Sequence, residues 1–267
     1  MIVNLDGTNF GGQASSCAGR SPRNLNWDHT CSQLGSTVHI DRRIWSKRGH
    51  APHYAWILET PETTRELETW LQTRQVQDKY GYEFFSKVFT HSTRLVKACP
   101  NAVWIPASGV WVQEIGAHPK SKRISMITSP KAHLPGHRVR LGWAERLKAH
   151  VDLFGLHHRI EKKEEGLKDY CFSVAIENAI APGYFTEKIL DCFATGTVPV
   201  YSGAPDISGF FNPAGIILLD QLKDWSRLTQ DRYEAMMPAV LDNLARVQGY
   251  LVPEDRMEEH LITQSVT

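Results

Sequence analysis

The second half of the chain alternates short apolar runs with segments of helical periodicity. The apolar runs have the length of buried strands, and Gly, Pro or Asn residues mark their ends. Strands that alternate with helices in this way predict a parallel sheet with helices on both faces. The predicted strands are 123–128, 151–155, 170–178, 197–203 and 215–220, the predicted helices are 136–150, 160–169, 185–195 and 206–211, and one or two further helices are expected within 228–252.

The first half shows a weaker pattern. Residues 2–6 are a possible strand, and little periodicity follows until the apolar run 54–59, which predicts a buried strand that ends in a loop at Glu59. A helix is expected over 62–77, and further strands over 86–92 and within 101–112. We therefore predict three parts: a short amino-terminal α/β domain at 1–119, a Rossmann-like domain at 120–245, and a carboxyl-terminal helix or tail at 246–267.

The composition is that of a globular protein and argues against a nucleic-acid binder, but it does not define a function. Hydrophobic residues make up 42% of the chain and charged residues 22%, which is ordinary globular usage. The net charge of +1 lacks the positive field that nucleic-acid binders use, so no nucleic-acid partner is expected. The five cysteines contain no C-x-x-C pair, and no signal peptide or membrane span is evident, so reduced thiols and a cytoplasmic location are expected.

Three loops that follow predicted strands carry clusters of polar residues. Ligands bind beyond the carboxyl ends of strands in sheets of this kind, so these loops are the candidate site. The segment after 123–128 supplies Lys131, His137, Arg138 and Arg140. The end of 170–178 and the loop beyond it supply Glu177, Asn178, Tyr184, Glu187 and Lys188. The end of 197–203 and the loop beyond it supply Tyr201, Gly203 and Asp206.

The middle loop is the most informative because Thr186 can cap the helix that follows it. A helix N-terminus attracts phosphate, and Lys188 in the first turn is unfavourable for the helix dipole but suits an anionic ligand. The alternative is an ordinary cap followed by a solvated Glu187–Lys188 pair. Two interpretations are also open for Arg138 and Arg140. Their guanidinium groups could each bind a phosphate through two hydrogen bonds, or the side chains could lie on the solvent-facing surface of the helix.

The stretch "CFSVAIENAIAPGYFTEKILDCFATGTVPVYSGAPDISGFFNPAGIILLD", residues 171–220, closely resembles the carboxyl-terminal half of family 10 glycosyltransferases, the α-1,3/1,4-fucosyltransferases. Their hallmark runs as F-x-x-x-x-E-N-S, then Y-x-T-E-K, then G-T-x-P-V-x-x-G. Ala179 departs from the serine of that pattern. The likeness extends upstream through residues 128–155, and more weakly through 55–62 and 88–112, so that it covers roughly 55–220.

The resemblance implies a GT-B type α/β fold of two Rossmann-like halves with parallel sheets, with the donor site in the carboxyl-terminal half. It implies an inverting transfer of L-fucose from GDP-β-L-fucose to a hydroxyl of a glycan acceptor. Matched positions place Asn178 and Lys188 at the diphosphate, Glu187 at the ribose hydroxyls and Tyr184 in the nucleotide pocket. The family's phosphate-binding arginine maps to Arg140, with Arg138 as second choice, and Glu177 and Tyr201 are further candidates.

An inverting transfer also needs a base that takes the proton of the acceptor hydroxyl. Glu59 matches the glutamate that the family places at a strand exit of its first half. Glu62 is the alternative, and either carboxylate could instead cap the helix that follows. His91 is a further candidate for donor or acceptor contact, although a lone histidine at a strand end is more often structural.

No cofactor or metal is expected, because the sequence has no D-x-D motif and the pair His157–His158 lacks the further ligands that zinc requires. Two other readings stay open: a transferase of the same fold that uses another nucleotide sugar, and an inactive nucleotide- or sugar-binding relative. The acceptor is not identified. The lack of an amino-terminal anchor favours a bacterial or viral enzyme.

Overall fold

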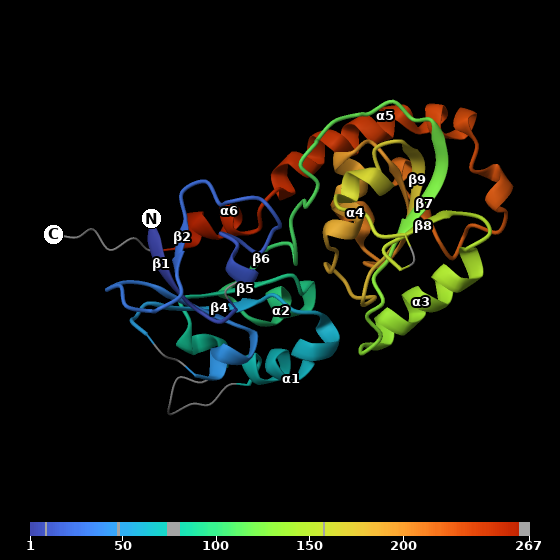
Figure 1. The fold of residues 1–267 in the computed structure, drawn as a ribbon. Helices are drawn as coiled ribbons and strands as arrows, with labels where there is room; N and C mark the ends of the chain where they lie inside the picture. The colour runs from blue at the N-terminus through green and yellow to red at the C-terminus, as the bar shows by residue number, and fades with distance from the viewer. Residues whose placement is uncertain (9, 47–48, 74–80, 157, 262–267) are drawn as a thin grey trace. The chain divides into compact units, whose positions relative to one another are not determined.

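The computed structural model describes the chain except residues 9, 47–48, 74–80, 157 and 262–267 (Figure 1). The chain forms two compact units. Unit 1 comprises Met1–Gly109, Pro182–Tyr184 and Val252–Thr267, and unit 2 comprises Val110–Ala181 and Phe185–Leu251. The predicted domain boundaries lay at 119/120 and 245/246, whereas these units divide at 109/110 and 251/252, and the last segment groups with unit 1.

Unit 1 is built on a six-stranded parallel sheet with the order β2-β1-β3-β4-β5-β6. Tyr54 and Trp56 of β4 belong to one apolar cluster, together with Met257. Ala55 and Ile57 belong to a second cluster, so helices cover both faces of the sheet. The elements are β1 (Ile2–Asp6), β2 (Asn26–Asp28), β3 (Thr37–Ile40), β4 (His53–Ile57), α1 (Pro61–Leu71), β5 (Lys87–Thr90), α2 (Thr93–Ala98), β6 (Ala102–Trp104) and α6 (Glu254–Met257).

Unit 2 is built on a five-stranded parallel sheet with the order β11-β10-β9-β7-β8. Its core joins Phe172 and Val174 of β9 to Leu147 of α3 and Val240 of α5. The elements are β7 (Lys122–Ile127), α3 (Pro135–Leu147), β8 (Asp152–Phe154), β9 (Tyr170–Ile176), α4 (Glu187–Ala194), β10 (Val198–Ser202), β11 (Ile217–Leu218) and α5 (Gln230–Val247).

The strand order of unit 2 reverses between β7 and β9. The chain leaves β7 to form β8 on one side, then returns to form β9 and β10 on the other side. The loops after β7 and β9 therefore diverge and open a crevice at the carboxyl ends of these strands, which is where open α/β sheets bind ligands.

Most of the predicted strands and helices are confirmed, but two predicted helices are wrong. Residues 160–169 contain a single 3-10 turn, Lys163–Gly166, because the Glu164 carboxylate turns inward to accept the backbone N–H groups of Gln113 and Glu114. Residues 206–211 likewise hold only the turn Ile207–Gly209. The other 3-10 turns are Phe10–Gly12, Asp41–Trp45, Gly81–Phe84, Pro213–Gly215, Trp225–Arg227, Gln248–Tyr250 and Glu258–His260.

The amino-terminal region contains more structure than its pattern predicted. β2 and β3 lie within residues that showed no periodicity, and β2 is only three residues long. The helix expected over 62–77 ends at Leu71, and part of that prediction lies outside the described residues. All five cysteines are free thiols. None of the helices formed by the described residues is both long and apolar enough to cross a membrane.

Candidate functional site

A cavity of about 290 Å³ lies in unit 2 at the switch point between β7 and β9. It is lined by the end of β7, the first turns of α3, the end of β9 and the first turns of α4. Two of the three candidate loops therefore meet here. The charged residues that line it are Lys131, Arg140, Lys163, Lys188, Glu187 and Asp191, so the balance of charge is positive.

The N-terminus of α4 is built as the sequence predicted. Thr186 is the N-cap residue, and its side-chain oxygen accepts a hydrogen bond from the Lys188 backbone N–H at 3.5 Å. Ile189, Leu190 and Phe193 are buried, so the helix is held by its apolar face while its first turn opens to the cavity. The Lys188 amine reaches back to Thr186 Oγ1 at 2.9 Å. The cap and the lysine thus form one unit at a helix end that attracts anions.

Glu177 accepts hydrogen bonds from Thr186 at the start of this helix and does not line the cavity. Its side chain is fully buried and accepts the Thr186 backbone N–H at 2.9 Å and the Thr186 hydroxyl at 2.6 Å. Burial raises the pKa of Glu177, although the nearby Lys188 charge acts in the opposite direction. Gly203 is required beside it, because a Cβ there would lie 2.6 Å from Glu177 Cγ and 2.2 Å from the Tyr201 hydroxyl.

Arg140 and Asn178 are brought together from α3 and from the loop after β9. Arg140 is 5% exposed and donates to Thr128 Oγ1 at 3.0 Å and to Asn178 Oδ1 at 2.5 Å. Gly136 permits this approach, because a Cβ there would lie 1.7 Å from the Asn178 carbonyl oxygen. Arg138, by contrast, is exposed, donates to the Ala132 carbonyl and does not line the cavity. The structure thus favours Arg140 over Arg138 as the cation of this site.

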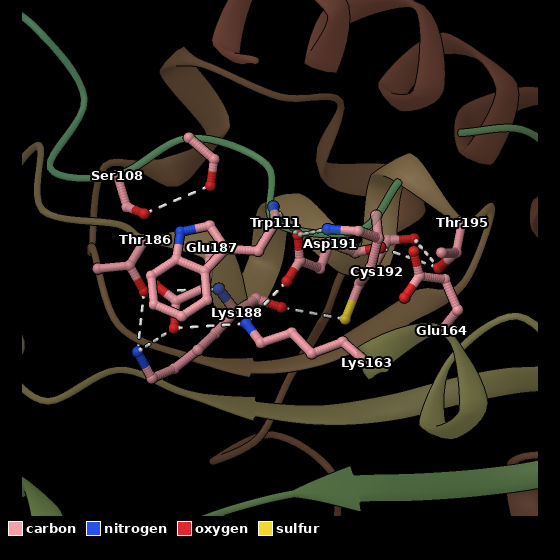
Figure 2. Close-up of polar contacts among 12 residues, drawn as sticks. Ser108, Trp111, Lys163, Glu164, Thr186, Glu187, Lys188, Asp191, Cys192 and Thr195 are labelled. Carbon is pink, nitrogen blue, oxygen red and sulfur yellow. Dashed lines mark hydrogen bonds and ion pairs between the residues drawn. The ribbon is translucent and has the colours of Figure 1, made fainter. Parts of the chain in front are cut away.

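Lys163 and Asp191, to which the sequence did not point, also line the cavity, as does Trp111. Figure 2 shows the Lys163 amine directed at the carboxylates of Asp191 and Glu187, at 2.8 and 3.7 Å. The amine also lies 4.5 Å from the centre of the Trp111 ring. Asp191 Oδ1 accepts the backbone N–H groups of Trp111 and Val112, which ties this segment to α4. One signal was available: Asp191 follows Glu187 by one helical turn, so both carboxylates lie on the same face of α4.

Burial and neighbouring charges shift the pKa values of Glu187, Lys163 and His137 in this cavity. Burial on its own raises the pKa of Glu187, but the charges of Lys188 and Lys163 outweigh it and hold that pKa well below its ordinary value. Burial lowers the pKa of Lys163, but Asp191 and Glu187 outweigh that effect and raise it. Burial and the Arg140 charge lower the pKa of His137 to about 4, so this imidazole is neutral at pH 7.

Glu59 lies in unit 1, where it is exposed and lines a separate cavity of about 340 Å³. Its backbone N–H donates to Asp41 Oδ1 at 3.3 Å, and its carbonyl oxygen accepts from His91 Nε2 at 2.8 Å. His91 is fully buried, and this hydrogen bond ties its ring to the backbone of the loop. Glu62 is exposed in the first turn of α1 and does not line this cavity.

The two candidate tyrosines are both buried. Tyr184 is 2% exposed and groups with unit 1, where its ring packs edge-on against His91. Tyr201 is 1% exposed, and its hydroxyl accepts the Ala204 backbone N–H. Tyr201 and Gly203 line another cavity of unit 2, of about 950 Å³, so the third candidate loop does not join the Arg140–Lys188 site.

Of the pair His157–His158, His157 is outside the described residues, and His158 is exposed and does not line the cavity. Two tryptophans, Trp104 and Trp143, also do not line the cavity: Trp104 is partly buried in unit 1 and donates to the His91 carbonyl, and Trp143 packs against the core of unit 2. Among the residues that the structure describes, no three His, Cys, Asp or Glu side chains are grouped to hold a metal ion. Independence from metal stays a prediction.

Unit 2 has the doubly wound α/β architecture, in which ligands bind at the switch point, and cations gather there in this chain. Residues 118–234 match the model of glycosyltransferase family 10 (fucosyltransferase), carboxyl-terminal part. This match contains the whole of the stretch 171–220 and confirms its resemblance to that family.

Two curated proteins are similar over short stretches. The α-(1,3)-fucosyltransferase FucT of Helicobacter pylori is 34% identical over 70 residues, which is 26% of this chain and 15% of that protein. A putative fucosyltransferase-like protein of Arabidopsis thaliana is 41% identical over 64 residues, which is 22% of this chain and 12% of that protein. The chain thus spans well under a fifth of the length of either relative.

Solved structures extend the likeness of fold to nearly the whole chain. A crystal structure of α1,3-fucosyltransferase with GDP-fucose has a TM-score of 0.55 at 13% identity and covers 94% of this chain and 90% of that one. A structure of α1,3-fucosyltransferase with GDP has a TM-score of 0.53 at 14% identity and covers 91% and 80%. The predicted fold class, two α/β units with parallel sheets of the GT-B type, is confirmed.

Proposed function

We propose that this chain is an inverting glycosyltransferase that transfers L-fucose from GDP-β-L-fucose to a hydroxyl group of a glycan. One observation carries the proposal: Arg140, Lys188 and Glu187 converge on one cavity at the switch point of unit 2. These residues lie within the segment that matches the fucosyltransferase family. An α-1,3 linkage is proposed from the names of the similar proteins.

The donor's diphosphate suits the cationic side of the cavity. Arg140 is held by Thr128 and Asn178, so its guanidinium is already ordered before a ligand arrives. Such a fork can contact two phosphate oxygens, and Lys188 adds a point charge at the positive end of α4. The Glu187 carboxylate, kept ionised by its lysine neighbours, can accept hydrogen bonds from the ribose hydroxyls.

In the proposed transfer, the acceptor oxygen forms a bond to C1 of fucose on the face opposite the nucleotide. The bond between C1 and the β-phosphate oxygen breaks, and its electron pair stays on GDP. Glu59 takes the proton of the acceptor hydroxyl as general base. Arg140 and Lys188 stabilise the charge that develops on the departing GDP, which is the role that a divalent metal has in other transferases. We therefore propose that the reaction needs no metal.

The donor site is tested by calorimetric titration of GDP, with UDP as the competing nucleotide and EDTA present throughout. Lys188→Ala should weaken GDP binding by at least about tenfold, which corresponds to about 1.4 kcal/mol. Lys148→Ala is the matched control, because Lys148 is exposed next to the end of α3 and pairs with Glu145 outside the cavity. Absence of GDP binding, or binding that is indifferent to Lys188→Ala, would contradict the proposed site. Stronger binding of UDP would indicate another nucleotide sugar.

The proposed base is tested separately from the donor site. Glu59→Gln should retain GDP binding and lose at least about a hundredfold in transfer of fucose to a panel of glycans, as general bases typically contribute a factor of this size or more. Glu62→Gln is the control, because that carboxylate lies outside the cavity that Glu59 lines. Equal losses in the two variants would remove Glu59 from the mechanism, and a wild type that binds GDP-fucose without transfer would indicate an inactive relative.

A further inference from the structure

The Glu187 carboxylate lies between two lysines that have different surroundings. Lys188 is the closer, at 3.2 Å, but its amine also contacts Thr186 Oγ1 at 2.9 Å and Glu177 at 3.6 Å. Lys163 lies at 3.7 Å from Glu187 and comes from the 3-10 turn 163–166, far from α4 in the sequence. These two ammonium groups face the same carboxylate.

Lys163 is anchored by Asp191 and Trp111, groups of the protein itself. Its amine pairs with Asp191 Oδ2 at 2.8 Å and lies over the Trp111 ring (Figure 2). The Asp191 side chain is 2% exposed, and its other oxygen is bound to the backbone of residues 111 and 112. Lys163 itself is 27% exposed, so its position is set by packing and by charge together.

We infer that Lys163 is a positioning residue of the donor site, which keeps the Glu187 carboxylate ionised and oriented toward the ribose hydroxyls while Lys188 binds the diphosphate. This inference rests on the proposed function. In this inference Lys188 binds the nucleotide, whereas Lys163 positions the Glu187 side chain of the protein.

A bound diphosphate changes the surroundings of Lys188. A phosphate oxygen competes for the Lys188 amine, so Glu187 keeps less of its nearest cation when the donor binds. The Glu187 side chain is only 15% exposed, and a largely buried carboxylate that loses its cation either takes up a proton or remains charged at a high cost in desolvation free energy. A protonated carboxyl group has less capacity to accept two hydroxyl hydrogens than a carboxylate has. Lys163 prevents this change because its own partners stay in place.

The test compares GDP with 2′,3′-dideoxy-GDP, which lacks both ribose hydroxyls, by calorimetric titration. Wild type should prefer GDP by about tenfold or more, since hydrogen bonds to charged groups have this order of strength. Lys163→Met should reduce the preference to less than about threefold, mainly through weaker GDP binding. Lys162→Met is the matched control, because this neighbouring lysine is exposed and does not line the cavity, and it should keep the wild-type preference.

The ratio of the two affinities separates positioning from stability. A merely structural role of Lys163 would weaken both nucleotides equally and leave the ratio unchanged, which would overturn the inference while GDP binding still supports the proposed function. A wild type that binds both nucleotides equally would also overturn it. A wild type that binds neither would overturn the proposed function itself. Lys163→Gln, which keeps most of the stem and a polar head, is measured in parallel and decides the question if the Met variant does not fold.

Discussion

Replacement of Gly136 by alanine tests whether the approach of α3 to the loop after β9 assembles the proposed donor site. A Cβ at Gly136 would lie 1.7 Å from the Asn178 carbonyl oxygen, whereas ordinary contact begins at 3.4 Å, so the helix and the loop must separate by roughly that difference. The partner is backbone and cannot rotate away. Overpacking of this kind costs about 1–3 kcal/mol.

The same displacement would lengthen the hydrogen bond from Arg140 to Asn178, because Arg140 belongs to α3 and Asn178 belongs to the loop. We expect Gly136→Ala to lower the midpoint of thermal unfolding by roughly 2–10 °C and to weaken GDP binding by at least about tenfold, since misplacement by about 1 Å is enough to disable a positioned group. Differential scanning fluorimetry and calorimetric titration measure the two effects.

Gly142 supplies the control within the same helix. A Cβ there would meet nothing closer than Arg146 Nη2 at 3.7 Å. Gly142→Ala should therefore stabilise α3 by about 0.5–1 kcal/mol through helix propensity and leave GDP binding unchanged. If Gly136→Ala behaves like Gly142→Ala in both assays, the close approach of α3 to Asn178 does not organise the site, and the reasoning is refuted.

Three further predictions concern single groups. Arg140→Ala should weaken GDP binding by about tenfold or more, whereas Arg138→Ala should change it little in the same titration; equal effects would contradict the choice between them. Thr186→Ala should cost about 0.5–2 kcal/mol in unfolding free energy by loss of the cap, with Thr186→Ser retaining most of it; an unchanged alanine variant would show that the cap is unimportant. Burial raises the pKa of Asp41 from 3.8 to about 6, so the folded state binds this proton more tightly and the associated stability is lost as pH rises through about 6. Asp41→Asn should therefore flatten the dependence of unfolding free energy on pH between about 4 and 6, by up to about 1.4 kcal/mol per pH unit, in chemical denaturation; an unaltered slope would contradict the raised pKa.

The helix start at Thr186 could be predicted from the sequence because all of its determinants are local. A capping residue, a charged first turn and an apolar face lie within one continuous segment, and the structure confirms each of them. The buried strands β7, β9 and β10 were predictable for the same reason, since a strand covered on both faces must be apolar throughout. The short strands β2 and β3 were not, because elements of three or four residues carry too few positions to show a period.

The local sequence pattern did not predict which of Arg138 and Arg140 faces the cavity. Two residues apart on a helix, these side chains point in different directions, but the direction that meets the ligand depends on how α3 packs against β9. The close approach at Gly136 decides it in favour of Arg140. Glu177 is a similar case, because its position beside Asn178 gave no sign that its carboxylate is buried beneath Thr186.

The sequence by itself determined the class of fold, the capped helix at the carboxyl end of β9 and the residues Arg140, Asn178, Glu187 and Lys188 as candidates. Only the tertiary structure revealed Lys163, whose ion pair with Asp191 joins residues 28 positions apart. The pattern of residues 160–169 is typical of a charged, solvent-exposed helix. The sequence does not indicate which carboxylate pairs with Lys163. The physical reason is that caps and apolar periodicity act between neighbours along the chain, whereas the charge balance of a buried site depends on loops that only the folded sheet brings together.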